Sequence, residues 1–442
     1  MPSFALIQST SDRLWNIDEQ GVTPGGAGAP NLIVTNQTGQ TWKGFGGCFN
    51  ELGWRMLSGL TPEKRDAVFR DLFAPDGDCR FTFCRVPIGA SDYAESWYSL
   101  NEHPDDFAME HFSIERDQNA LIPYIREAQK WQPDLKFFAS PWGPPTWLKR
   151  PAEYHGGSLI TEEKYCSAYA LYLLKFAQAY KAQGIPIAQI HVQNEPMFAH
   201  NFPSCVWTGE QMRDFIRDYM GPLFEREGVD TEIWAGTING PQGDQLHPNC
   251  NHFVNLILED PEARKHVSGV GYQWAGKLAI QRTRQSWPDL PLMQTENECG
   301  DGRNTWDYAC YVWDLFYHYI TNGAEAYIYW NMALQPEGES TWGWKQNSLI
   351  TVDPETGDVT CNPEYYVMKH FSRYIRPGAQ RLNLLGRWSG YAVGFRDDRS
   401  IVLAVRNPFA EAKELQIELP GAARYSCRLQ PLSINTLVLA ME

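Results

Sequence analysis

The chain has 442 residues, of which 43% are hydrophobic and 21% are charged, a composition typical of a globular protein with a large core. Its formal net charge of −15, without any long basic run, argues against a partner such as nucleic acid or an anionic membrane surface. No segment approaches the roughly 18 uninterrupted apolar residues of a membrane span, and the 10 cysteines include no CxxC pair that would indicate a zinc or redox site.

The first 40 residues contain short strand candidates, such as NLIVTN, separated by Gly/Pro-rich turns. A lone hairpin is marginally stable in water, so we expect these strands to join a β region elsewhere in the chain. The opening segment MPSFALIQSTSDRLW has no basic stretch followed by an apolar core, so it is not a signal peptide as it stands. This predicts a cytoplasmic protein with reduced core thiols, or a secreted one if an export segment has been removed.

Eight short apolar runs then favour strands, and helical patterns lie between them. The runs are residues 44–47, 81–89, 136–142, 189–195, 232–239, 269–274, 290–297 and 326–331. Strands that alternate with helices pair in parallel, so eight such units predict an α/β protein with a closed (β/α)8 barrel, the TIM barrel.

The fourth run ends in HVQNEPM, residues 191–197, which raises the question of why a strand should end this way. Proline cannot donate to a sheet ladder, so the strand must stop and leave Asn194 and Glu195 at its carboxyl end. Ligands bind at that end of a barrel. The seventh run carries Glu296 next to its last residue, and a barrel places the ends of its fourth and seventh strands across one mouth.

Two carboxylates that face each other in an aromatic cleft suit the cleavage of a glycosidic bond, because one can donate a proton while the other attacks. Arg85, at the end of the second run, is placed to keep a neighbouring glutamate ionised. Many of the 17 tryptophans lie beside Pro, Gly, Asn or Asp and are candidates for lining the cleft, since an indole packs on the C–H face of a sugar. A single glutamate at a strand end would be explained by a helix cap or a surface position, but the pair favours catalysis.

After residue 382 the sequence alternates at period two between turn signals, which predicts an antiparallel β region. We therefore divide the chain into residues 1–40 and 383–442, which together form one β-sandwich domain, and residues 41–382, which form the barrel.

A series of ordered motifs from about Trp42 to Leu382 resembles glycoside hydrolase family 30, and within it the glucosylceramidase branch. The motifs include KGFGGCFNE, RVPIGASDY, ASPWGPPTWLK, QNEP, TENECG and YWNMALQPEG. The resemblance implies a barrel beside a β-sandwich built from both chain ends, and a retaining β-glycosidase that uses no metal or organic cofactor. The implied partner is a β-linked glycoside or oligosaccharide, with β-glucosides favoured. A β-xylosidase, a β-fucosidase and an endo-β-1,6-glucanase are alternatives, and a non-catalytic carbohydrate-binding protein is the alternative of another class.

The resemblance also implies roles for single residues. Glu195 matches the acid/base, Glu296 matches the nucleophile, and Arg85 matches the arginine beside the nucleophile. The substrate-binding side chains of the family fall on Asp92, Trp142, Asn194 and Trp330. We expect Glu296 to be ionised and Glu195 to carry a proton, with the two carboxyl groups roughly 5–5.5 Å apart.

The chain departs from the family pattern at the end of the sixth strand. Where the family often has His-Trp-Tyr, this chain has Gln273, Trp274 and Ala275, so the tyrosine near the nucleophile is missing or supplied from elsewhere. Glu298 is a competing carboxylate two positions after the assigned nucleophile. The resemblance also predicts a cis peptide between Trp330 and the residue that follows it.

Overall fold

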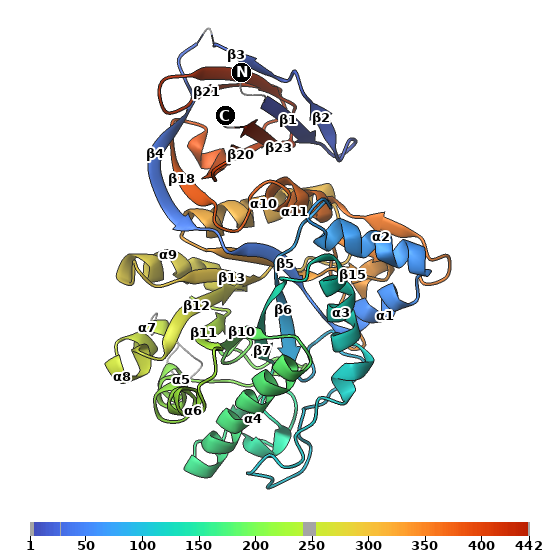
Figure 1. Cartoon of the computed structure of the whole chain (residues 1–442), viewed down its shortest axis with the longest axis vertical. Helices are drawn as coiled ribbons and strands as arrows, with labels where there is room; N and C mark the ends of the chain where they lie inside the picture. The colour runs from blue at the N-terminus through green and yellow to red at the C-terminus, as the bar shows by residue number, and fades with distance from the viewer. Residues whose placement is uncertain (1–3, 27, 242–252, 441–442) are drawn as a thin grey trace.

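The structure is a computed structural model that describes residues 4–26, 28–241 and 253–440. It contains an eight-stranded sheet, which is the barrel, and a ten-stranded sheet, drawn above it in Figure 1.

The barrel consists of parallel strands in chain order, and each predicted run contributes one of them. The strands are β5 (Gly44–Cys48), β6 (Phe83–Ile88), β7 (Lys136–Pro141), β10 (Ile187–His191), β11 (Glu232–Ile238), β12 (Val267–Gln273), β13 (Leu292–Glu296) and β14 (Ala326–Asn331). The last two strands meet through a parallel bridge between Leu292 and Ala324, next to β14. The predicted (β/α)8 fold is therefore confirmed.

Helices lie on the outside of the barrel, and all of them except the last, which follows β14, lie between successive barrel strands in the chain. They are α1 (Glu51–Ser58), α2 (Pro62–Phe73), α3 (Leu121–Trp131), α4 (Glu163–Ala182), α5 (Gly209–Phe215), α6 (Gly221–Glu227), α7 (Phe253–Leu258), α8 (Pro261–Arg264), α9 (Lys277–Ser286), α10 (Trp306–Thr321) and α11 (Pro363–Ser372). Several begin at residues that favour helix starts; in α5, for example, the side chains of Thr208 and Gln211 form a capping box. Among the described helices, none is long and apolar enough to cross a membrane.

The inside of the barrel is filled at one level by large apolar side chains. They come from different strands and pack as one cluster: Phe83, Phe138, Trp234, Met293, Ala326 and Ile328. Side chains alternate along a strand, so the residue two positions further on points to the same face. Arg85, Ser140, Thr295 and Trp330 are therefore placed directly above this apolar layer, at the carboxyl ends of their strands.

Both ends of the chain form the ten-stranded sheet. Its strands are β1 (Phe4–Ser9), β2 (Asn16–Asp18), β3 (Val22–Pro24), β4 (Leu32–Thr41), β18 (Gln380–Leu385), β19 (Ala392–Arg396), β20 (Ser400–Asn407), β21 (Lys413–Glu418), β22 (Arg424–Leu429) and β23 (Ser433–Ala440). Leu6 and Val22, from strands near opposite edges of this sheet, lie in one apolar cluster, so the sheet curls over its own core. The predicted β-sandwich from both chain ends is confirmed, while the exact boundaries at residues 40 and 382 stay a prediction.

Short strand pairs complete the described structure. They are β8 (Lys149–Arg150) with β9 (Ser158–Leu159), and β15 (Ala333–Leu334) with β16 (Ile350–Val352) and β17 (Val359–Cys361).

Two details differ from expectation. The fourth barrel strand, β10, ends at His191, before the Asn194–Glu195 pair, and Glu195 takes a left-handed backbone conformation with φ of 51°. In the described chain the cis peptides are Arg150–Pro151 and Gly236–Thr237, so the cis peptide expected after Trp330 is wrong.

Candidate active site

A cavity of about 400 Å³ opens at the carboxyl ends of the barrel strands. Its lining includes many of the residues predicted from the sequence, namely Asp92, Trp142, Asn194, Glu195 and Glu296. The volume falls within the range of small-molecule sites, and the position is the one at which TIM barrels bind ligands.

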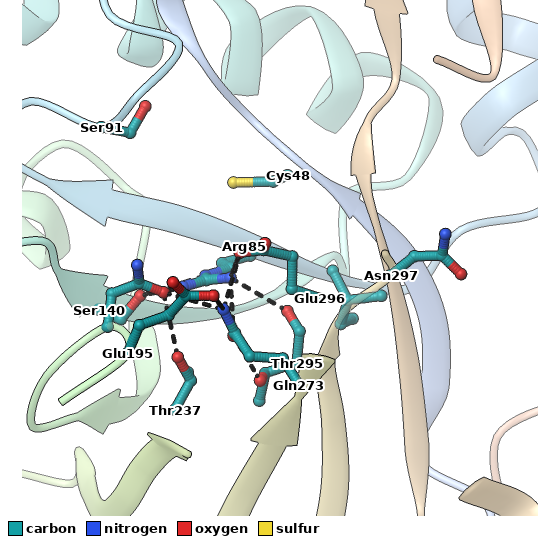
Figure 2. Close-up of polar contacts among 12 residues, drawn as sticks. Cys48, Arg85, Ser91, Ser140, Glu195, Thr237, Gln273, Thr295, Glu296 and Asn297 are labelled. Carbon is teal, nitrogen blue, oxygen red and sulfur yellow. Dashed lines mark hydrogen bonds and ion pairs between the residues drawn. The ribbon is translucent and has the colours of Figure 1, made fainter. Parts of the chain in front are cut away.

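Arg85, which is fully buried, lies beneath the cavity and joins several strands (Figure 2). Its Nη1 lies 2.6 Å from Oε2 of Glu296, and its Nη2 donates to Oδ1 of Asn194 at 2.6 Å. The guanidinium also donates to Oγ of Ser140, through Nη2 at 2.8 Å. A buried arginine with these partners holds the end of β13 against the ends of β7 and β10.

Gln273, at the end of β12, contacts both glutamates. Its Nε2 donates to Oε1 of Glu195 at 2.9 Å and to Oε2 of Glu296 at 3.1 Å. Its Oε1 accepts from Oγ1 of Thr295 at 2.9 Å and also faces Nη1 of Arg85. A guanidinium can only donate, so the amide atom on that side must be the oxygen. The amide is thus oriented with its NH2 group between the two carboxylates.

Trp274, the next residue, gives Glu296 a further donor. Its indole Nε1 donates to Oε1 of Glu296 at 2.8 Å, while Arg85 and Gln273 occupy Oε2. Both oxygens of Glu296 therefore accept hydrogen bonds. The tyrosine that the family pattern often has near the nucleophile is absent here, and the indole of Trp274, which follows β12, is a donor to Glu296 in this region.

The electrostatics of the cavity are dominated by three buried carboxyl groups beside one arginine. Burial, opposed by Arg85 and reinforced by the charge of Glu195, raises the pKa of Glu296 to about 7. Burial and the charges of both glutamates raise the pKa of Asp92 to about 8. Asp92 and Glu296 therefore hold protons near neutral pH that chemistry can use.

Glu195 follows β10 in a turn that its own backbone stabilises. Its N–H donates to the carbonyl of Thr237 at 3.1 Å, across to β11, and its left-handed φ is a conformation that costs energy for a non-glycine residue. On the side away from Gln273, Oε2 of Glu195 lies 2.6 Å from Nε2 of His200. Strained residues of this kind cluster at functional sites, where surrounding contacts hold them.

Asn194 is fixed by donors to its side-chain oxygen. Arg85 Nη2, Thr237 Oγ1 and Gln273 Nε2 donate to Oδ1 at 2.6, 3.1 and 3.2 Å respectively. This leaves the NH2 group of a cavity-lining amide available to a ligand.

The two predicted tryptophans lie together but not in equivalent places. Their ring centroids are 5.2 Å apart, and the guanidinium carbon of Arg85 lies 4.6 Å from the Trp142 ring and 5.4 Å from the Trp330 ring. Trp142 lines the cavity, whereas Trp330 is not among the lining residues. Both residues are 1% exposed, and the indole nitrogen of Trp330 has no hydrogen-bond partner among the described residues.

Glu298, the competing carboxylate, is directed elsewhere. It pairs with Lys277 Nζ and accepts from Oη of Tyr311 at 2.8 Å. Because β13 ends at Glu296, the alternation that would have aligned the two glutamates does not continue. In Figure 2 the side chain of Asn297 points away from the cluster that holds Glu296.

Several residues of the site were not assigned a role from the sequence. Gln273, Trp274 and Ala275 were noted only as departures from a family pattern, and the contacts of the first two to the glutamates depend on the closed barrel. The other lining residues lie in loops, where no periodicity marks them: Phe198, His200, Phe202, Asn239, Gly300, Trp344, Lys345 and Gln346. Of these, Phe198 and Trp344 are 43% and 39% exposed and form an aromatic rim on the cavity.

Comparison with known proteins gives consistent matches over most of the chain. Residues 42–375 match the model of the glycosyl hydrolase family 30 TIM-barrel domain. The chain is 29% identical to lysosomal acid glucosylceramidase of Mus musculus over 409 residues, covering 86% of this chain and 78% of that protein. It is 25% identical to endo-1,6-beta-D-glucanase of Neurospora crassa over 440 residues, covering 94% and 90%. A solved structure, the endo-beta1,6-glucanase BT3312, superposes with a TM-score of 0.89 at 22% identity, covering 100% of this chain and 99% of that one.

Proposed function

The chain belongs to glycosyl hydrolase family 30, and on that basis we propose that it is a retaining β-glycosidase that releases glucose from β-glucosides. That it is a glycoside hydrolase follows from the family. The roles of single residues and the choice of sugar are the further steps, and each is supported by contacts in the cavity.

One contact carries the proposal of retention. A single nitrogen, Nε2 of Gln273, donates to one oxygen of Glu195 at 2.9 Å and to one oxygen of Glu296 at 3.1 Å. Those two oxygens cannot be farther apart than the sum of these distances. Two carboxyl groups that share one amide donor lie close together, and a close pair is what retention requires: carboxyl groups are roughly 5–5.5 Å apart in retaining enzymes and roughly 6.5–9.5 Å apart in inverting ones. The separation is compatible with direct attack by a carboxylate.

The donors to each glutamate divide the roles. Burial raises the pKa of Glu296 to about 7, but the charged Arg85 and the indole of Trp274 oppose this rise and favour the ionised form, in which Glu296 acts as the nucleophile. Glu195 carries the proton and gives it to the glycosidic oxygen as that bond breaks, while Glu296 forms an ester with the anomeric carbon. Glu195 then takes a proton from water, and the oxygen of that water displaces Glu296 from the sugar.

The remaining lining residues support a single bound sugar next to the glutamates. Trp142 offers an apolar face, Asp92 offers acceptors for hydroxyl groups, and Asn194 offers a donor beside the nucleophile. Glucose is the sugar named in both the glucosylceramidase and the glucanase relatives, so a β-linked glucosyl group is the proposed glycone.

A panel of 4-nitrophenyl β-glycosides tests the glycone, with kcat/KM measured for the glucoside, xyloside and fucoside. We expect the glucoside to be preferred over the xyloside by roughly tenfold or more, because the xyloside lacks a hydroxymethyl group that the pocket would contact. The first product observed by NMR should be the β-anomer. Faster xyloside hydrolysis would overturn the glucose assignment, and a first product of α configuration would overturn retention.

Endo-β-1,6-glucanase activity is a second candidate. It is favoured by the glucanase relative and by the rim of Phe198 and Trp344, which offers stacking surface for a sugar beyond the glutamates. Digestion of a linear β-1,6-glucan separates the two candidates: early release of oligosaccharides of mixed length supports the endo-glucanase, and release of glucose alone supports the glucosidase.

A further inference from the structure

His200 contacts the acid/base but has no role in the mechanism described above. It lies in the loop between β10 and α5, where Nε2 approaches Oε2 of Glu195 to 2.6 Å. The imidazole stacks on the ring of Phe202, with centroids 4.5 Å apart and planes at 5°. The side chain is 25% exposed and lines the cavity, so it is held in place but remains in contact with solvent.

Glu195 has two different kinds of partner. Oε1 accepts from the amide of Gln273, which cannot lose its proton, and Oε2 faces the imidazole, which can. Among the described residues, no lysine and no second carboxylate contacts these two oxygens of Glu195. Of these two contacts in the described structure, the imidazole of His200 is the one that can exchange a proton with Glu195.

The charges that act most strongly on the imidazole are negative, and Lys345, which also lines the cavity, is paired with Glu337. The negative charges are the carboxyl groups of Glu195, Asp92 and Glu296, from the loops and strand ends that surround the cavity. Burial opposes ionisation of His200, but the contact with Glu195 and the charges of the other two carboxyl groups outweigh it and raise the pKa above its ordinary value.

We propose that His200 is a positioning residue that shares the catalytic proton with Glu195, so that the imidazole and the carboxyl group together hold one proton in the free enzyme. This inference rests on the proposed role of Glu195 as acid/base. When the glycosidic C–O bond breaks, its electron pair goes to the leaving oxygen, which takes the shared proton from Glu195. The pair is then neutral imidazole and carboxylate. When water attacks the ester, its proton returns to Glu195, and the pair again holds one proton.

The expected consequence is a wider pH range for acid catalysis. Activity on a substrate that needs a proton is lost at high pH only when the pair loses its last proton, and the imidazole retains that proton to higher pH than a carboxyl group alone. In His200→Gln the alkaline limb of kcat/KM for phenyl β-glucoside should move to lower pH by about one pH unit. With 2,4-dinitrophenyl β-glucoside, whose leaving group needs no proton, the limb should stay where it is.

The chain offers a matched control in His155, whose Nε2 lies 3.1 Å from Oε2 of Glu153 outside the residues that line the cavity. His155→Gln removes a histidine–glutamate pair without touching the acid/base, and should leave both profiles unchanged. An unmoved limb for phenyl β-glucoside in His200→Gln, or an equal movement with both substrates, would overturn the proposal.

An NMR titration of the histidine C–H signals measures the titration midpoint of His200 beside Glu195 without any substrate. We expect the midpoint of His200 in the wild-type chain to lie above 6.5 and to fall by about one pH unit in Glu195→Gln, which removes the carboxylate and keeps the shape. A midpoint that does not change would refute the shared proton, even if the kinetic variant fails to fold. Absence of hydrolysis of any β-glycoside by the wild-type chain would instead refute the proposed function.

Discussion

Glu195 and Glu296 are the same residue type, but their neighbours differ. Glu296 accepts from a charged guanidinium, an indole and an amide, whereas Glu195 contacts an amide and an imidazole. Hydrogen bonds and opposite charges that favour the ionised form lower the proton affinity of a carboxyl group. The two glutamates should therefore fail in different ways when they are replaced.

Replacement of the acid/base should depend on the leaving group. In Glu195→Ala, kcat/KM on phenyl β-glucoside should fall by about 10²–10⁴-fold, the usual contribution of general acid catalysis. On 2,4-dinitrophenyl β-glucoside the first step should be nearly unchanged, and added azide should restore turnover and give β-glucosyl azide, because a small anion needs no general base. Equal losses on both substrates, with no azide product, would contradict the assignment.

Trp274→Phe tests the donor that replaces the expected tyrosine. The variant keeps the ring but loses the 2.8 Å hydrogen bond to Glu296, which lowers the pKa of that group. The pKa of Glu296 should rise further, so the acid limb of kcat/KM should move to higher pH, and kcat should fall about 10-fold or more. Trp344→Phe, at the cavity rim, is the control and should leave the acid limb in place. An acid limb that moves in neither variant would show that the indole does not act on Glu296.

At the scale of elements, the sequence predicted the strands better than their ends. Each apolar run corresponds to a barrel strand. These strands could be predicted because an apolar run and the turn residues that bound it are both visible in the local sequence. The end of β10 is not marked in this way, because Glu195 N–H still donates to the carbonyl of Thr237 on β11 while its own backbone turns into a left-handed conformation.

The same distinction applies to the site. Glu195, Glu296 and Arg85 were found from motifs at strand ends, and the structure brings them together. Gln273 stood out only as a substitution, since its donation to both carboxylates arises when β12 is placed beside β13. His200 lies in a loop that has no periodicity, and its sequence neighbours give no sign of its contact with Glu195.

Close packing of the barrel strands makes a further prediction at this scale. A Cβ atom added to Gly46 in β5 would lie 1.9 Å from the carbonyl oxygen of Phe83 and 2.8 Å from Sγ of Cys84, so the strands would have to move apart. Gly46→Ala should lower the free energy of unfolding by about 1–3 kcal/mol or more, measured by chemical denaturation. Gly59→Ala, at a helix end with α-helical dihedrals and no atom nearer than 3.6 Å, should be close to neutral. Equal stability of the two variants would show that β5 and β6 are not packed this closely.

At the scale of the whole molecule, the β-sandwich is joined to the barrel through α11. Nε2 of His370 lies 2.7 Å from Oγ of Ser9, and its Nδ1 lies 2.8 Å from Oγ1 of Thr436. Next to it, Nζ of Lys369 lies 4.1 Å from the centroid of the Trp15 ring. One helix of the barrel therefore contacts strands or loops from both ends of the chain (Figure 1).

This junction should be sensitive to acid. Burial, with a smaller effect of Lys369, lowers the pKa of His370 to about 3, whereas an unfolded histidine titrates near 6.5. The unfolded state then binds the extra proton, so the stabilisation is complete above about pH 6.5 and is lost as the pH falls toward 3. Between pH 7 and pH 5 this single group should cost about 2 kcal/mol of the free energy of unfolding.

Urea unfolding at both pH values measures this cost, with His370→Gln as the comparison. The variant should lose about 2 kcal/mol less than the wild type over the same interval. An identical pH dependence in the two proteins would show that His370 does not set the acid sensitivity of the junction.

The identity of the nucleophile is the central claim, and trapping the covalent intermediate tests it most directly. The chain is incubated with 2,4-dinitrophenyl 2-deoxy-2-fluoro-β-glucoside, digested and mapped by mass spectrometry. We predict one fluoroglucosyl ester on Glu296, which disappears in Glu296→Ala and persists in Glu298→Ala. An ester on Glu298, or one that persists in Glu296→Ala, would contradict the assignment.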